Sequence, residues 1–347
     1  ITDAAVGTVL VGHSAGAALT TGAGNTAIGY QAGAAITTGA LNTAVGYQAL
    51  SQNQNVGNFN TAVGYRCLYS VNPAADDEGF NTAMGTAAGF ELTTGEKNTY
   101  IGNDCGYYNE TGDNNVYVGH NAGVGANNNN HSNNTAVGSN AMLAVTTGAD
   151  NTVIGSTAGD ALTSGGSNVL IGMNAGGNFD GEDHNVAIGR SAFSGAVAGA
   201  NYCVAIGGTA MQGAATQNGT VAVGYTALNA LTSGAANIAI GYRAASATTN
   251  SAGNVAIGHD AMRLCSVSDG HNVAIGHGVM AGGTGGYYNI CIGKDTGAAF
   301  ADANVGTCVL IGHEAGDAIN NSGADSTIAI GYQALSALQS GAGNVAI

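Results

Sequence analysis

The segment Gly12-His13-Ser14-Ala15-Gly16 has the spacing of a nucleophile elbow, Gly-x-Ser-x-Gly, in which a sharp turn exposes a catalytic serine. That chemistry requires a strand, a turn and a helix in succession. The same frame recurs at Gly119–Gly123 and Gly312–Gly316, where asparagine and glutamate replace the serine. A frame that keeps its glycines and loses its nucleophile indicates a structural repeat. We therefore expect no catalytic residues, and we expect the chain not to be an enzyme.

A second candidate site is a set of tyrosines and histidines that each follow a glycine preceded by valine or isoleucine. Aromatic rings supply binding area at a low cost in conformational entropy, so an exposed column of rings could contact carbohydrate or another surface. Alternatively, the rings stack and shield the backbone, or contact a second chain, and the sequence favours this structural interpretation. The set comprises Tyr30, Tyr47, Tyr65, Tyr225, Tyr242, Tyr332, His13, His120, His259, His277 and His313.

Two acidic clusters offer several oxygen ligands of the kind that Ca²⁺ prefers. They are Asp76-Asp77-Glu78 and Asp180-Gly181-Glu182-Asp183. Neither has the spacing of a known calcium loop and neither recurs along the chain, so solvated loop charge is the favoured interpretation. The pair His259 and His277 lacks a third ligand in a matching position. The sequence therefore predicts no cofactor, with calcium at the acidic loops as the alternative.

All these candidates belong to one repeat. A glycine preceded by Val, Ile or Met recurs nineteen times between Gly12 and Gly331, and eleven of the eighteen gaps are 17 residues long. We call each such glycine the anchor of its coil, and we call a position counted from it a slot. Residues 1–347 are expected to form one repetitive domain of about nineteen coils, each of about 17–19 residues, as an excerpt of a longer fibre.

The slots before each anchor predict a strand. Asparagine is frequent at −4, a β-branched residue occupies −3, alanine is usual at −2, and Val or Ile occupies −1 except at Met84. A short, β-branched segment that ends in glycine is typical of a strand. The high glycine content, 59 of 347 residues, disfavours helix. One strand per coil predicts an all-β chain folded as a parallel β-solenoid, with equivalent slots about 4.8 Å apart.

Asparagine at −4 has a physical explanation, because a stacked amide can donate to one neighbouring coil and accept from the other. The predicted structural ladder comprises Asn25, Asn42, Asn60, Asn81, Asn98, Asn115, Asn134, Asn151, Asn168, Asn185, Asn237, Asn254, Asn272 and Asn289.

Both faces of the predicted strand are apolar, and a strand that is buried on both faces needs two covering layers. We expect slots +3 and +7 of the same coil to cover one face. We expect the small alanines at −2 to approach a neighbouring chain, so the chain is predicted to be a homo-oligomer.

The net charge, the apolar runs and the cysteines restrict the possible binding partners and cross-links further. The formal net charge of −15, with six Lys and Arg, argues against binding to nucleic acid or to an anionic membrane. No run of apolar residues is long enough to insert into a membrane. The six cysteines occupy slots that do not face one another, so they are expected to be small core residues rather than disulfide partners.

The segments Asn185–Gly189, Asn254–Gly258 and Asn272–Gly276 all read Asn-Val-Ala-Ile-Gly, which resembles the head repeat of YadA-like trimeric autotransporter adhesins. Gly24–Gly33 is similar to repeats of long bacteriophage tail fibres. The resemblance implies a left-handed parallel β-roll, a homotrimer, and an outer surface that attaches to a host or a matrix. The coils here are longer than those of the adhesin heads.

The resulting expectation is a non-enzymatic extracellular fibre segment, a shaft or a head, on a bacterial surface or a phage virion. It would attach to a host-surface glycan or a matrix by multivalent display. The alternatives are a passive structural filament or spacer with no ligand, and an ice-binding solenoid. Ice binding is disfavoured because threonine at −3 gives way to Val or Ile from Val169 onward.

Overall fold

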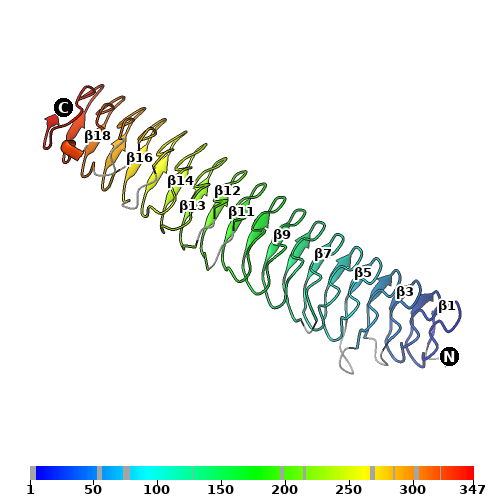
Figure 1. Cartoon of the computed structure of the whole chain (residues 1–347). Coiled ribbons are helices and arrows are strands. Elements are labelled where there is room, and N and C mark those ends of the chain that lie inside the picture. The colour runs from blue at the N-terminus through cyan, green and yellow to red at the C-terminus, as the bar shows by residue number, and fades with distance from the viewer. Residues whose placement is uncertain are drawn as a thin grey trace. The chain divides into compact units, whose positions relative to one another are not determined.

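The computed structural model describes residues 5–52, 57–72, 79–127, 129–195, 199–213, 216–265, 270–283, 286–300, 305–320 and 322–347. The chain divides into two compact units, which we describe separately. The first consists of Ile1–Asn174 with Phe179–Gly181, and the second of Ala175–Asn178 with Glu182–Ile347. In each unit the chain winds in successive coils with one short strand per coil (Figure 1).

The first unit contains ten strands of three residues each. They are β1 (Val9–Val11), β2 (Thr26–Ile28), β3 (Thr43–Val45), β4 (Thr61–Val63), β5 (Thr82–Met84), β6 (Thr99–Ile101), β7 (Val116–Val118), β8 (Thr135–Val137), β9 (Thr152–Ile154) and β10 (Val169–Ile171).

The second unit contains ten more strands and, among the described residues, a single 3₁₀ turn (η1, Ser322–Ala324) as its only helical element. The strands are β11 (Val186–Ile188), β12 (Val204–Ile206), β13 (Val221–Val223), β14 (Ile238–Ile240), β15 (Val255–Ile257), β16 (Val273–Ile275), β17 (Ile290–Ile292), β18 (Val309–Ile311), β19 (Ile328–Ile330) and β20 (Val345–Ala346).

Consecutive strands within each unit pair in parallel and in register. Ala27 lies opposite Ala44, and Ala205 lies opposite Ala222, so equivalent slots stack coil upon coil. The prediction of an all-β parallel solenoid is thus confirmed for each unit. The strands cover slots −3 to −1 and are shorter than the predicted segment of slots −4 to 0, because the −4 asparagine and the anchor glycine lie just outside them.

The prediction that the −2 alanines face a neighbouring chain was wrong. Ala27 and Ala44 have no exposed surface, whereas Ile28 and Ile101 at −1 are 39% exposed. Strand side chains alternate between two faces, and here the −2 face points into the coil while −3 and −1 point outward. The interior is thin, so the small slot is the buried one.

The interior beneath the −2 column is filled by the same chain. Alanine at +3, such as Ala32, and bulky residues at +7, such as Leu92 and Leu162, are buried. All six cysteines are free and buried in this interior. Where tyrosine replaces alanine at −2, glycine makes room for it: a Cβ at Gly106 would meet the ring of Tyr100 at 2.8 Å.

The anchor glycine has a conformational and a steric role. Gly102 has φ +144°, which side-chain-bearing residues rarely adopt, and a Cβ there would overlap the carbonyl oxygen of Gly119 in the next coil. The turn continues through left-handed residues at +2, including Gln48 (φ 56°) and Arg66 (φ 50°). The strand therefore ends where the backbone must bend sharply and lie close to its neighbour.

The asparagines at −4 form a buried hydrogen-bonded ladder within each unit. Asn98 Nδ2 donates to Asn81 Oδ1 of the preceding coil (3.2 Å) and to the Gly112 carbonyl that closes its own coil (2.9 Å). Asn98 Oδ1 accepts from the backbone N–H of Asn115 in the following coil (2.9 Å) and from its Nδ2 (3.1 Å). Each amide thus joins successive coils and also closes its own.

In the part of the chain that the structure describes, no helix combines the length and the apolar character needed to cross a membrane. The acidic cluster Asp76–Glu78 lies outside the described residues.

Candidate functional site

Most members of the predicted ring column stack on one another. In the first unit His13, Tyr30, Tyr47 and Tyr65 form a continuous stack with centroid separations of 5.4, 5.0 and 5.4 Å. The tyrosines of this stack are exposed, Tyr30 to 42%. The in-register +1 slots place each ring directly over the ring of the next coil.

The second unit repeats this arrangement. Tyr225, Tyr242, His259 and His277 stack at 5.7, 5.0 and 5.0 Å. A separate pair, His313 and Tyr332, stacks at 5.5 Å.

One member of the predicted column, His120, is flanked at +1 by Asn103 and Ser139, so its neighbours in the column are not rings.

The stacking limits what these rings can bind. The rings within the stacks lie within 20° of parallel, so their faces contact one another and their edges face solvent. A sugar that binds by laying its C–H face on a ring needs a free ring face. The geometry of the column therefore fits the structural interpretation, in which stacked rings cover the turn.

A polar column runs beside the rings at slot +2. Gln48 Nε2 donates to Gln31 Oε1 (2.7 Å), and Arg66 Nε donates to Gln48 Oε1 (2.9 Å). In the second unit Arg243 forms a bidentate pair with Asp260 at 2.8 and 2.7 Å. These groups hold one another in place across successive coils.

Two further ring columns were not predicted. At slot −5, Phe59 stacks on Phe80 at 5.0 Å. At slot +5, Tyr69, Phe90 and Tyr107 stack at 4.9 Å each. A count of aromatic residues at every slot would have found both columns.

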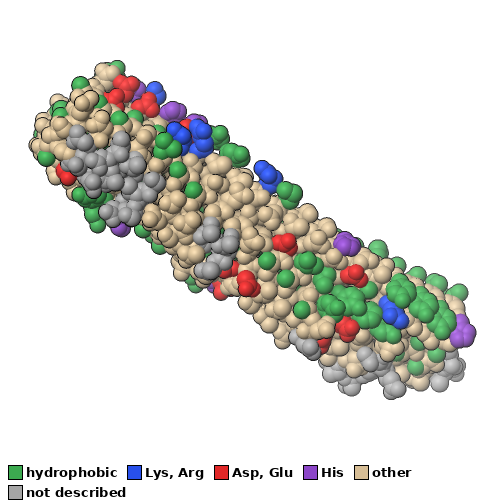
Figure 2. All heavy atoms as spheres, in the orientation of Figure 1, with side chains coloured by type: hydrophobic (Ala, Val, Ile, Leu, Met, Phe, Trp, Pro, Cys, Tyr) green, Lys and Arg blue, Asp and Glu red, His purple; other side chains and the backbone are tan. Residues whose placement is uncertain are grey.

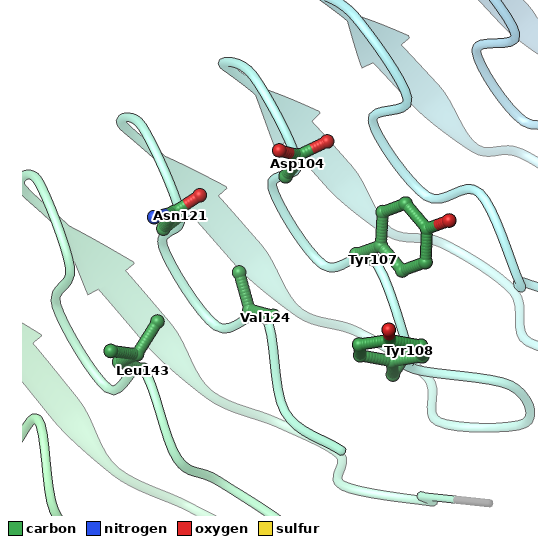
Figure 3. A pocket seen from close by; sticks show the side chains of 6 residues that line it. All are labelled: Asp104, Tyr107, Tyr108, Asn121, Val124 and Leu143. Atoms are coloured by element: carbon green, nitrogen blue, oxygen red, sulfur yellow. The ribbon is translucent and has the colours of Figure 1, made fainter. Parts of the chain in front are cut away.

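The +5 column ends in a pocket of about 240 Å³ in the first unit (Figure 3). It draws on three successive coils and is lined by Asp104, Tyr107, Tyr108, Asn121, Val124 and Leu143. In the coil after Tyr107 the +5 slot holds Val124, so the stack of rings in this column ends at Tyr107, which lines the pocket. In Figure 2, which shows one face of the molecule, hydrophobic side chains gather over part of the first unit.

The pocket combines an aromatic corner with polar groups. Tyr107 and Tyr108 meet edge to face with centroids 4.5 Å apart. Partial burial raises the pKa of the Tyr107 hydroxyl further above neutral pH, where a tyrosine hydroxyl is in any case protonated and able to donate. Asp104 and Asn121 provide a carboxylate and an amide from slot +2 of adjacent coils. The pocket can therefore hold an apolar ring face and accept or donate hydrogen bonds at its edge.

The pocket is smaller than the roughly 300–1,000 Å³ that drug-sized ligands occupy. It fits a single ring-sized group, such as one residue of a longer chain.

The other sequence candidates are separate from this pocket. Ser14 Oγ lies 3.0 Å from His13 Nδ1 on the exposed turn, and no carboxylate pairs with His13 in the described ranges. At the second acidic cluster, Asp180 in the first unit accepts from the Thr163 hydroxyl. In the second unit the buried Glu182 accepts from the backbone N–H of Gly199 (2.9 Å). Calcium at these residues stays a prediction.

Comparison with models of protein families gives no match, and no curated protein matches the chain.

Proposed function

We propose that the chain is a non-enzymatic segment of an extracellular attachment fibre, and that the pocket at Tyr107 binds one sugar residue of a surface glycan. The observation that carries this proposal is the end of the +5 ring stack at Tyr107, where an aromatic corner, a carboxylate and an amide line one small pocket. Such a pocket suits a ligand with one apolar face and a rim of hydroxyl groups.

In the proposed complex the C–H face of the sugar packs against the Tyr107 and Tyr108 rings, whose combination of apolar body and polar tip favours such ligands. Asp104 accepts from sugar hydroxyl groups and Asn121 can donate or accept. One such contact is weak, and attachment strength comes from several chains binding at once.

The several chains are proposed to be copies of this one, in the trimer and left-handed coil that the resemblance implies. The −2 side chains are buried inside the coil, so the chains are proposed to associate through the outward-facing side chains at −3 and −1. These present exposed apolar side chains in register, including Ile28, Met84 at 51% exposure, and Ile101. Contiguous exposed apolar surface marks interaction sites. Sedimentation equilibrium of the chain should give three times the mass of one copy.

A glycan array tests the attachment function. The parent chain should bind a restricted group of glycans, and Tyr107→Ala should reduce that binding at least tenfold because the ring face is lost. Tyr47→Ala is the matched control, since Tyr47 is an exposed ring of the same unit whose neighbours stack on both sides. The control should bind within twofold of the parent.

Two outcomes would count against the proposal. Equal binding by the parent and Tyr107→Ala would exclude the pocket as the glycan site. Absence of binding by the parent would favour a passive spacer without a ligand.

A further inference from the structure

A cluster of metal-ligating side chains lies in the second unit, whereas the pocket belongs to the first. One donor atom from each of Asp295, His313 and Glu314 lies within 4.8 Å of the others, and all three side chains are half-buried. Asp295 and Glu314 occupy slot +2 of adjacent coils, and His313 occupies slot +1 beside Glu314. The in-register coils therefore bring together residues that are well separated in the sequence and do not form a recognisable motif.

The charges of this cluster are unusual for its column. Elsewhere in the second unit slot +2 pairs Arg243 with Asp260, whereas Asp295 and Glu314 place two carboxylates on adjacent coils. Coils are about 4.8 Å apart, and two carboxylates at that spacing on adjacent turns repel each other. A cation held between these two carboxylates would remove that repulsion.

Neighbouring side chains contact some of the oxygen and nitrogen atoms of the three candidate ligands. Lys294 Nζ lies 3.2 Å from Asp295 Oδ2, and His277 Nδ1 lies 3.8 Å from Asp295 Oδ1. Gln333 Nε2 donates to one oxygen of Glu314 (2.6 Å), and the other oxygen lies 3.8 Å from His313 Nε2.

The His313 ring is oriented by stacking on Tyr332, and its buried Nδ1 has no hydrogen-bond partner among the described residues. A neutral imidazole with its proton on one nitrogen offers the other as a metal ligand.

The donor set selects the class of ion. Ca²⁺ and Mg²⁺ take oxygen ligands, whereas one imidazole with two carboxylates suits a first-row transition ion such as Zn²⁺. Donor atoms around tetrahedral Zn²⁺ are about 3.4 Å apart, given bond lengths of about 2.0–2.2 Å. Half-buried Asp and Glu side chains can make that adjustment by rotation about their side-chain bonds.

We propose that Asp295, His313 and Glu314 form a Zn²⁺ site that joins two adjacent coils of the second unit. The three side chains supply three ligands, and water completes the coordination shell. Lys294 releases Asp295 when the ion binds.

Isothermal titration of Zn²⁺ into the full chain tests this site. The parent should bind one Zn²⁺ per chain, and the ion should raise the melting temperature. His313→Ala and Glu314→Gln should each weaken binding at least tenfold. Glu314→Gln changes little in shape, so its fold should be retained. His13→Ala is the matched control, because this ring-column histidine is flanked at +2 by Ser14 and Gln31 instead of carboxylates.

Failure of the parent to bind Zn²⁺ would overturn the proposal and would indicate that Lys294 satisfies Asp295. Equal Zn²⁺ affinity in the parent, His313→Ala and Glu314→Gln would also overturn it, since the ion would then bind elsewhere. Neither result depends on glycan binding.

Discussion

A single buried asparagine links three successive coils by hydrogen bonds. Asn98 makes hydrogen bonds to the coils on both sides and to the closing turn of its own coil. Its side chain is buried, so water cannot replace a partner that is lost. A buried donor that loses its acceptor costs about 1–3 kcal/mol. Asparagine suits this slot because its side chain reaches both neighbours. Cys203 and Cys308 at the same slot keep the hydrogen bond from their backbone N–H to the preceding asparagine.

Asn98→Ala should lower the free energy of unfolding by about 1–3 kcal/mol, because the backbone N–H of Asn115 loses its acceptor. Asn103→Ala, at a half-exposed position, is the control and should change it by less than about 0.5 kcal/mol. Denaturant titration of both variants measures the difference. Equal stability of the two variants would mean that the ladder contributes little.

His131 makes the first unit sensitive to acid. Its ring is buried, Nδ1 lies 2.7 Å from the Tyr117 hydroxyl, and Nε2 has no partner among the described residues. Burial lowers the pKa of His131 to about 4. The unfolded chain takes up this proton near pH 6.5, whereas the folded chain does not, so protons favour unfolding between these values.

Stability should therefore be fully present above pH 6.5 and should fall by up to about 3 kcal/mol as the pH drops towards 4. Melting temperatures measured between pH 4 and 7 should show this loss for the parent and for His120→Asn, which alters an exposed histidine. His131→Asn should show a flatter pH profile. A profile as steep as the parent's would assign the acid sensitivity to other groups.

At the scale of the element, the turn after each strand depends on the anchor glycine. Gly102 and Gly219, a glycine just before β13, both have a positive φ, +144° and +69°, but only at Gly102 would a Cβ meet another coil. The two positions therefore separate backbone strain from the close approach of neighbouring coils.

Gly219→Ala should cost about 1–3 kcal/mol, the range for a strained backbone angle. Gly102→Ala should cost clearly more, because the added carbon also overlaps the Gly119 carbonyl. Chemical denaturation compares the two variants. Equal losses would show that the stacked coils can move apart to accommodate a methyl group.

The sequence predicts the strands and their register well, since one slot pattern persists from Thr26 to Ile330. It does not reveal which strand face is buried, because Ala27 and its neighbours Thr26 and Ile28 are all compatible with either face. The left-handed turn residues are also hidden, since Arg66 is not a residue type that favours such angles. The pocket escaped prediction because its lining comes from three coils and occurs at one place.

At the scale of the whole chain, the repeat gives a similar small apolar interior to successive described coils, while the outer slots vary. The outer slots hold stacked rings at Tyr30 and Tyr242, a pocket at Tyr107, and a ligand cluster at His313. In the proposed attachment, each chain presents its pocket once, and the strength comes from several chains that bind together.

Oxidative footprinting of the tyrosines, with and without a bound glycan, tests the central claim most directly because it needs no substitution. We expect the glycan to protect Tyr107 and Tyr108 from oxidation and to leave Tyr30 and Tyr47 unchanged. Protection of Tyr30 and Tyr47 with no effect at Tyr107 would contradict the account and would place the binding surface on the stacked ring column.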